Sequence, residues 1–282
     1  MKKICIPTDF SANGQNAIEY AIKLYKKQPC EFFILHSYYL PGFSKDNRFS
    51  PEPTNEKLNE VRVRAEKNMD VLKTRACFNA ADSKHTFHFL NEFGPFYEAL
   101  TNLIEREDIA LVIMGTRGET DNKNVIIGSN AVNVMEKVRN CPVMVIPSDV
   151  SYIPPNEIVF PTSFKTHYKQ RELATLIEIS NLTHAPIRIL HIKKGKNLNE
   201  RQIENKALLN EILAGTTFTH HTLFNLNLQQ GVRCFAQSRA SEMIAFINKK
   251  HKFFDSIFSH PMVKDLGDHI DVPVLALHDL RN

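Results

Sequence analysis

The sequence contains no tryptophan, and it has only 10 glycines and 14 prolines in 282 residues. So few glycines and prolines exclude a collagen-like or low-complexity chain. No stretch approaches the ~20 consecutive apolar residues that a membrane-spanning helix requires. The apolar character of the first ten residues is interrupted at Pro7 and Asp9 before the core of a signal peptide could form. We therefore expect a cytoplasmic protein that does not associate with membranes.

Cysteine and net charge are also low. The five cysteines are an odd number, are widely spaced and include no Cys-x-x-Cys pair, so a disulfide framework or a zinc site is not expected. The 35 basic and 31 acidic side chains give a formal charge of +4, and the basic residues are scattered in short clusters. Binding to nucleic acid requires a concentrated basic surface with stacking aromatics, so we do not expect it here.

The length and an internal repeat indicate two domains. A chain of 282 residues suits two domains of about 140 residues, and 43% apolar with 23% charged residues is typical of a folded protein. The opening KKICIPTDF is answered by NEIVFPTSF after residue 155, and FFILHSY by IRILHIK after residue 186, which indicates a duplication. The segment 148–156 contains two consecutive prolines and lacks periodicity. We therefore predict one domain at residues 1–148 and a second at 155–282.

Apolar runs alternate with segments of helical periodicity along both halves. In the first half the expected strands are 3–7, 32–36, 86–90, 110–114 and 142–146, separated by helices of which the first begins behind a Ser11 cap and the last spans 131–138. In the second half the repeats are followed by expected strands at 217–223, 243–247 and 272–277 and by a short helix at 232–238. Continuous apolar strands between helices indicate parallel sheets covered on both faces. The predicted fold is α/β, with two tandem open parallel five-stranded sheets of Rossmann-like type.

One glycine-containing stretch suggests an anion-binding site. MGTRGETDNKNVIIGSN, residues 114–130, follows the fourth strand and runs into a helix. Spaced glycines at a strand end suit a backbone cradle for phosphate, and the N–H groups at a helix start favour an anion. Alternatively, Gly115 and Gly118 make an ordinary turn and Ser129 or Asn130 only caps the helix. The position at the carboxyl ends of parallel strands, where ligands bind in open α/β sheets, favours a ligand site.

This stretch resembles the universal stress protein family, whose ATP-binding members carry Gly, two residues, Gly, nine residues and then Gly-Ser or Gly-Thr. The chain matches this spacing with Gly115, Gly118 and Gly128-Ser129. IPTDFS at 6–11, LHSY at 35–38 and CPVMVIP at 141–147 are also similar to that family. The resemblance covers essentially all of the first half, and it implies the adenine-nucleotide α-hydrolase-like form of the fold.

The resemblance implies a site for ATP or AMP, with or without Mg²⁺. Asp9 would bind the ribose or adenine side of the nucleotide, although it is also placed to be a turn or cap carboxylate before the first helix. Arg117 and Lys123 could offset the triphosphate charge or face solvent. The full expected nucleotide-binding set is Pro7, Thr8, Asp9, His36, Ser37, Gly115, Thr116, Arg117, Gly118, Gly128, Ser129 and Asn130.

The second half departs from this pattern. Ser163 stands where the first half has Asp9, and no glycine occurs between Asn248 and Gly267. An apolar cluster at helical spacing takes the place of the glycine loop, as core or as a partner-binding patch; it consists of Phe253, Phe254, Ile257 and Phe258. We expect this half not to bind ATP and to stabilise the first half or a dimer.

The sequence lacks the motifs of phosphate chemistry and hydrolysis, including the Walker A, Gly-x-Gly-x-x-Gly, Gly-x-Ser-x-Gly and His-Glu-x-x-His patterns. We therefore assign no catalytic residue or metal site and expect at most weak ATP hydrolysis. The leading hypothesis is a stress-response protein that binds ATP or AMP in its N-terminal domain and presents a nucleotide-dependent surface to a protein partner. The alternatives are an interaction protein that binds no nucleotide and a very slow ATPase. The closing strands near 143–146 and 274–277 could pair across domains or chains, giving a pseudo-dimer within the chain or a homodimer.

Overall fold

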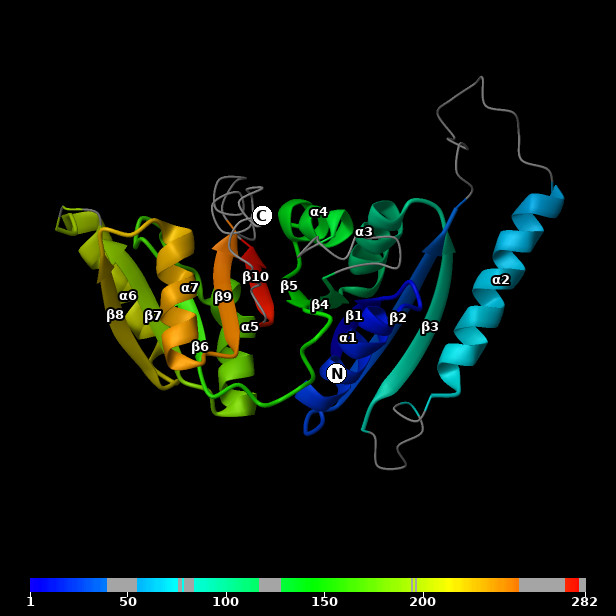
Figure 1. Cartoon of the computed structure of the whole chain (residues 1–282), viewed down its shortest axis with the longest axis horizontal. Helices are drawn as coiled ribbons and strands as arrows, with labels where there is room; N and C mark the ends of the chain where they lie inside the picture. Colours follow the sequence, from blue (N-terminus) through cyan, green and yellow to red (C-terminus); the bar gives the residue numbers. More distant parts are fainter. Residues whose placement is uncertain are drawn as a thin grey trace, which may run out of the picture.

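The strands of both halves form one continuous sheet. The computed structural model describes residues 1–39, 55–75, 78, 84–116, 128–193, 195, 197–248 and 272–278. Within these ranges ten strands are hydrogen-bonded in the order β3-β2-β1-β4-β5-β10-β9-β6-β7-β8 (Figure 1). The helices of the described ranges include none that is long and apolar enough to cross a membrane.

The order of elements is the predicted alternation of strands and helices. The first half consists of β1 (Lys2–Pro7), α1 (Ala12–Leu24), β2 (Cys30–Tyr38), α2 (Asn55–Lys73), β3 (Thr86–Phe93), α3 (Phe96–Glu107), β4 (Leu111–Gly115), α4 (Ser129–Lys137) and β5 (Val143–Ile146). The second half consists of β6 (Ile158–Pro161), α5 (Gln170–Thr183), β7 (Ile187–Lys193), α6 (Glu200–Leu213), β8 (Phe218–Phe224), α7 (Leu228–Arg239), β9 (Met243–Asn248) and β10 (Val274–His278). The predicted α/β class is therefore confirmed.

Two helices begin earlier than their apolar periodicity predicts. α4 begins at Ser129 behind an N-cap at Gly128, two residues before the predicted start. α7 begins at Leu228 because the Asn227 side chain caps it by accepting a hydrogen bond from the backbone N–H of Gln230. Ser11 caps α1 as predicted, with its hydroxyl accepting from the N–H of Gly14.

The two five-stranded sheets that the sequence predicts are joined into one, because the closing strands of the two halves pair with each other, which is one of the two pairings expected for them. β10 pairs antiparallel with β5, with Leu275 opposite Met144, whereas the other strand pairs of the sheet are parallel. Every residue of both strands is buried. Two short apolar strands would otherwise leave their backbone groups unpaired at sheet edges, and each supplies the partner that the other needs. Figure 1 shows β10, in red, beside β5 and between the two halves.

Helices cover both faces, and the apolar cores run across the junction. On one face a single cluster contains residues of α1, α2, α5 and α6, such as Ile18, Met69, Leu176 and Leu209. On the other face Leu103 of α3 belongs to a cluster that includes residues of β9 and β10. A further cluster lies under α7. Burial of these apolar faces therefore stabilises the two halves together.

Polar contacts also cross between the halves. Asn248, at the end of β9, donates from its side-chain amide to the Met135 carbonyl of α4 at 2.7 Å. Arg139 donates to the Asn248 carbonyl at 3.0 Å. On the other face Lys2 of β1 forms an ion pair with Glu178 of α5. The two contacts of Asn248 therefore fix the C-terminal end of α4 to the second half.

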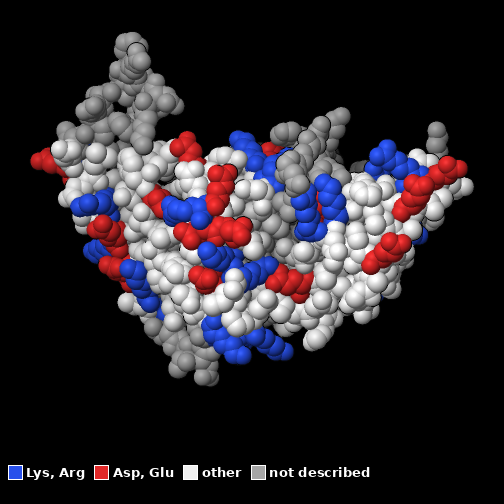
Figure 2. Space-filling model, turned by 180° about the vertical axis from the view of Figure 1, so that it is seen from behind, with Lys and Arg blue, Asp and Glu red and all other residues white. Residues whose placement is uncertain are grey.

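The charged side chains do not gather into one basic surface on the face shown in Figure 2. Lysine and arginine are interspersed there with aspartate and glutamate. Among the ion pairs of the described residues, Arg106 pairs with Glu92. A concentrated electrostatic footprint for nucleic acid is therefore not present on that face.

His278 makes the junction sensitive to acid. Its side chain is 1% exposed, and neither ring nitrogen has a hydrogen-bond partner among the described residues. Burial, and then the nearby Arg139 charge, lowers the pKa of His278 to about 3. An unfolded histidine has a pKa near ~6.5, so acid protonates the unfolded chain first. The contribution of neutral His278 to the free energy of unfolding is thus fully present above pH ~6.5. It falls by about 1.4 kcal/mol per pH unit between pH ~6.5 and ~3.

We predict that His278→Leu removes this acid sensitivity because leucine carries no titratable group. Between pH ~7 and ~4.5 the free energy of unfolding should fall by about 2 to 3 kcal/mol less in the variant than in the wild type. Urea unfolding of both proteins at these two pH values measures the difference. The same loss in both proteins would show that His278 does not titrate with this low pKa.

Candidate functional site

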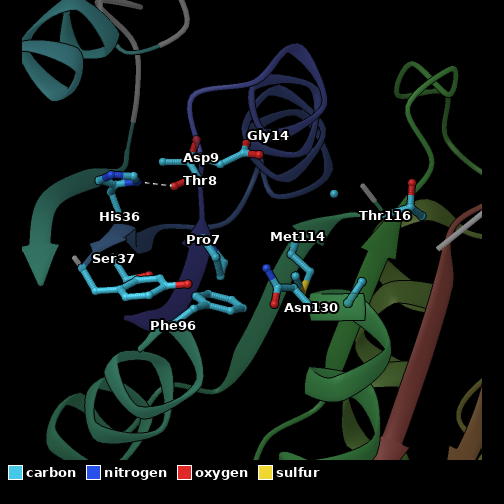
Figure 3. A pocket seen from close by; sticks show the side chains of 13 residues that line it. Pro7, Thr8, Asp9, Gly14, His36, Ser37, Phe96, Met114, Thr116 and Asn130 are labelled. Carbon is cyan, nitrogen blue, oxygen red and sulfur yellow. Dashed lines mark hydrogen bonds between the residues drawn. The ribbon is translucent and has the colours of Figure 1, made fainter. Parts of the chain in front are cut away.

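A pocket lies at the carboxyl ends of the first-half strands. The strand order β3-β2-β1-β4-β5 reverses its direction of growth between β1 and β4, and ligands of open α/β sheets bind at such a switch point. The cavity here has a volume of about 200 Å³ (Figure 3). Its lining residues are Pro7, Thr8, Asp9, Gly14, His36, Ser37, Tyr39, Phe96, Met114, Gly115, Thr116, Asn130 and Ala131.

A hydrogen-bonded turn after β1 forms one wall. The Thr8 hydroxyl accepts from the N–H of Phe10 at 3.0 Å, and Asp9 Oδ1 accepts from the N–H of Ser11 at 3.1 Å. Phe10 has a φ of 66°, which turns the chain sharply into α1. Short polar side chains that bind the backbone two residues on are typical of such turns. Asp9 is therefore the turn carboxylate that one of its two expected roles describes, and its side chain also lines the pocket.

His36, at the end of β2, is held against this turn. Its Nδ1 lies 2.9 Å from the Thr8 carbonyl oxygen, shown by the dashed line in Figure 3. A carbonyl oxygen can only accept, so Nδ1 carries the proton and Nε2 of the neutral ring is an acceptor. The ring packs against Phe10 with centroids 4.3 Å apart, and burial lowers the pKa of His36. A neutral histidine is thus fixed in one tautomer at the pocket.

Two glycines allow elements to approach closely around the pocket. A Cβ on Gly14 would lie 2.9 Å from the Thr8 hydroxyl oxygen, and one on Gly115 would lie 2.7 Å from Cγ and Nδ2 of Asn13. At Gly115 the neighbour that requires glycine is the Asn13 side chain of α1, and the backbone φ there is not positive. This packing requirement is separate from the predicted role of Gly115 in a phosphate cradle.

The start of α4 forms the opposite wall. The Gly128 N–H donates to the Thr116 carbonyl at 2.6 Å, and the Thr116 N–H donates to the Ile146 carbonyl at 2.9 Å, so the start of α4 is held against the end of β4. The first N–H groups of a helix have no acceptor within the helix, and Gly128 has no side chain with which to cap them. Asn130 and Ala131 of this first turn line the pocket. Such a helix start favours an anionic group.

The structure brings most of the predicted site residues together. The predicted residues that line the pocket are Pro7, Thr8, Asp9, His36, Ser37, Gly115, Thr116 and Asn130. Gly128 and Ser129 begin α4 beside them but are not among its lining residues. Arg117 and Gly118, with Lys123, lie outside the described residues.

Sequence reasoning missed five lining residues, which are Gly14, Tyr39, Phe96, Met114 and Ala131. Met114 and Ala131 adjoin predicted site residues, so the motif itself could have indicated them. Phe96 begins α3 directly after Gly94-Pro95, just beyond the carboxyl end of β3. Its position near a strand end is the signal that could have indicated it. These side chains add apolar surface to a pocket whose predicted members are mostly polar.

The second half repeats the turn but not the pocket wall. Phe164 donates from its N–H to the Thr162 hydroxyl at 3.2 Å and has a φ of 56°, and His191 Nδ1 lies 2.9 Å from the Thr162 carbonyl. Ile192 occupies the position in the second half that corresponds to Ser37 in the first. It packs so closely on Gly231 of α7 that a Cβ on this glycine would lie 2.4 Å from the Ile192 Cδ1 atom. Apolar packing therefore occupies this part of the second half. The predicted aromatic cluster at 253–258 and the glycine-free stretch lie outside the described residues.

Three of the four cysteines in the described ranges are buried, and Cys234 is exposed. No group of three or more histidine, cysteine, aspartate or glutamate side chains there could hold a metal ion. Cys5, Cys30 and Cys141 are buried free thiols, and burial raises the pKa of Cys30 to about 11 and that of Cys141 to about 12. Thiols with such raised pKa values are unreactive at neutral pH.

The fold and pocket define a doubly wound α/β protein with a cavity at the switch point of its first half. A profile of the universal stress protein family matches residues 1–147, just over half of the chain, and the chain belongs to this family. Universal stress protein MJ0577 of Methanocaldococcus jannaschii is 28% identical over 158 residues, covering 51% of this chain and 94% of that protein.

Among the solved structures that resemble the whole chain are the following two. A universal stress protein from Archaeoglobus fulgidus DSM 4304 superposes with a TM-score of 0.68 at 15% identity, covering 98% of each chain. A putative universal stress protein from Pseudomonas aeruginosa UCBPP-PA14 gives a TM-score of 0.60 at 10% identity, covering 99% of this chain and 93% of the other. At these identities the similarity shows the shared fold.

We predict that Gly115→Ala destabilises the protein because the new methyl group forces Asn13 to move. Adding a methyl group to a closely packed position costs about 1 to 3 kcal/mol. Gly215→Ala is the matched control, since a Cβ there meets nothing within 4 Å. Urea unfolding should separate the two variants, and equal free energies of unfolding for both would contradict the close approach at Gly115.

Proposed function

We propose that the first half of the chain binds one molecule of ATP or AMP, with or without Mg²⁺, and that the protein is a cytoplasmic, nucleotide-dependent binding module of the stress response. The observation that carries this proposal is the pocket at the switch point, which combines a polar turn after β1 with the uncapped start of α4. Membership of the universal stress protein family supports the same function.

The two walls suit the two ends of a nucleotide. Asp9 is a hydrogen-bond acceptor for ribose hydroxyl groups, and the neutral His36 ring offers a further acceptor at Nε2. Across the pocket Asn130 and the start of α4 would receive phosphate groups, because the helix N-terminus favours negative charge. Phe96 and Met114 supply the apolar surface that a base needs. In Figure 3 Asn130 and Met114 lie across the opening from His36.

We further propose that residues 1–148 and 155–282 are two domains of unequal function. The second would bind no ATP, because Ser163 replaces the pocket carboxylate and Ile192 packs against α7. Its role would be to complete the sheet through β10 and to stabilise the first domain as a pseudo-dimer within the chain. A homodimer would then have to use surfaces other than the two joined strands.

Asn130→Asp tests the nucleotide site without weakening the fold. A carboxylate in the first turn of α4 is favourable toward the helix dipole but repels phosphate groups in the pocket. We expect one ATP per chain in calorimetric titration of nucleotide-free protein, weakened at least about tenfold by Asn130→Asp. Asn59→Asp is the matched control, because it makes the same change of charge in the second turn of α2, away from the pocket.

Three results separate the possibilities. Loss of ATP affinity in Asn130→Asp alone, with an unchanged melting temperature, supports the proposed site. Equal losses in both variants would point to net charge and contradict it. If the wild type takes up neither ATP nor AMP and releases no nucleotide on denaturation, as judged by mass spectrometry, the protein is an interaction protein that binds no nucleotide. Phosphate release during the same incubation measures any slow hydrolysis.

A further inference from the structure

A second cavity lies in the other half of the molecule, between α6 and the sheet. It has a volume of about 260 Å³ and is found toward the carboxyl ends of β7 and β8. Its lining residues are Phe164, His191, Lys193, Asn197, Leu198, Lys206, His220, His221, Thr222 and Phe224. None of these is acidic, whereas two are lysines and three are histidines.

Strand alternation brings most of this set to one face. Successive side chains of a strand point to opposite faces, so Lys193 of β7 shares its face with Ile187 and Ile189. Those two isoleucines pack in the same core cluster as Leu209 of α6. On β8, Phe218 packs on the same cluster, which places Phe224 on that face as well. The cavity is therefore on the α6 side of the sheet, opposite α7.

Hydrogen bonds fix the cavity walls in place. Gln202 of α6 closes a capping box with Asn199 and also donates from Nε2 to the Ser163 carbonyl at 2.8 Å. Asn205 donates to the Phe164 carbonyl at 2.9 Å. These contacts attach α6 to the turn after β6, so the cavity is preformed.

The positive charges of the cavity have no acidic partner among the residues that the structure describes. The Lys206 ammonium lies 5.8 Å from the Phe164 ring centroid and forms no ion pair with the described residues. The Lys193 ammonium lies 5.8 Å from the Phe224 ring centroid and donates to the Asn197 side-chain oxygen at 2.8 Å, again without an ion pair in the described part. The pKa of His220 is lowered by burial and then by Lys206 and His221, as expected in an electropositive environment.

We propose that this cavity binds a small phosphate monoester, with Lys193 and Lys206 holding the doubly charged phosphate and the Phe164 and Phe224 rings contacting its organic body. Two ammonium groups without a counter-charge match a dianion, and lysine binds phosphate as a point charge. The aromatic surface favours a compact apolar body over bare inorganic phosphate. This site is distinct from the first-half pocket and does not depend on nucleotide binding there.

Phenyl phosphate is the probe for this site, because it joins a dianion to an aromatic ring. Calorimetric titration of the full chain should show one binding event, weakened about tenfold by Lys206→Gln and by Lys193→Gln. Arg201→Gln is the matched control, since it removes one positive charge from the exposed side of α6 outside the cavity. Phenol, which lacks the charge, and inorganic phosphate, which lacks the ring, should each bind at least about tenfold more weakly.

Repeating the titrations in Asn130→Asp protein removes any phosphate binding at α4. Phenyl phosphate affinity that survives Asn130→Asp and Arg201→Gln but falls in both lysine variants supports the proposal. Absence of binding overturns it, and so does binding that is lost in Asn130→Asp but kept in the lysine variants. An equal decrease in Arg201→Gln and the lysine variants would show only a net-charge effect and would also overturn it. Far-ultraviolet circular dichroism and the melting temperature check that each variant is folded.

Discussion

The antiparallel pairing of β5 with β10 is the interaction on which the arrangement of the whole chain depends. Each strand closes the parallel sheet of its own half, and each would otherwise present unpaired backbone groups at an apolar edge. By pairing, they become the central strands of a ten-stranded sheet. Both strands are buried along their whole length, and the cores on the two faces continue across them.

This junction leaves the carboxyl ends of each half free to develop separate sites. The strand orders β3-β2-β1-β4-β5 and β8-β7-β6-β9-β10 correspond, so each half has its own switch point. The turns after β1 and β6 have kept the same hydrogen bonds from histidine to threonine carbonyl, at 2.9 Å in both. The surroundings of these turns differ. In the first half the turn and the start of α4 together line a pocket. In the second half the apolar Ile192 stands at the position of Ser37 and packs on α7, and a basic cavity lies on the α6 side.

The sequence predicted the order of elements well because period and capping are local properties. The apolar strands were recognisable from their composition, and the Ser11 cap from its place before helical periodicity. The two-domain reading rested on the repeats around PTDF and PTSF. Eight of the twelve expected nucleotide-binding residues line the pocket, because they follow strand ends that the fold brings to one edge of the sheet.

What could not be predicted depends on contacts between distant segments. The partner of β5 is a strand more than a hundred residues away, and either a domain of the same chain or another chain could have supplied it. The requirement for glycine at position 115 comes from Asn13 of α1, which no local pattern reveals. Phe96 lines the pocket because α3, which it begins, packs on β2 and β1. The lysines of the second cavity are likewise brought together only by strand alternation and by the docking of α6.

We infer that the two duplicated halves have different ligand sites, with the nucleotide confined to the first. This difference can be measured by hydrogen–deuterium exchange of the intact chain, with and without saturating ATP. We expect added protection at residues 7–9, 36–37, 115–116 and 128–131, and none at the corresponding turn and strand end, 161–163 and 191–192. Added protection in the second half, or no change anywhere, would contradict it.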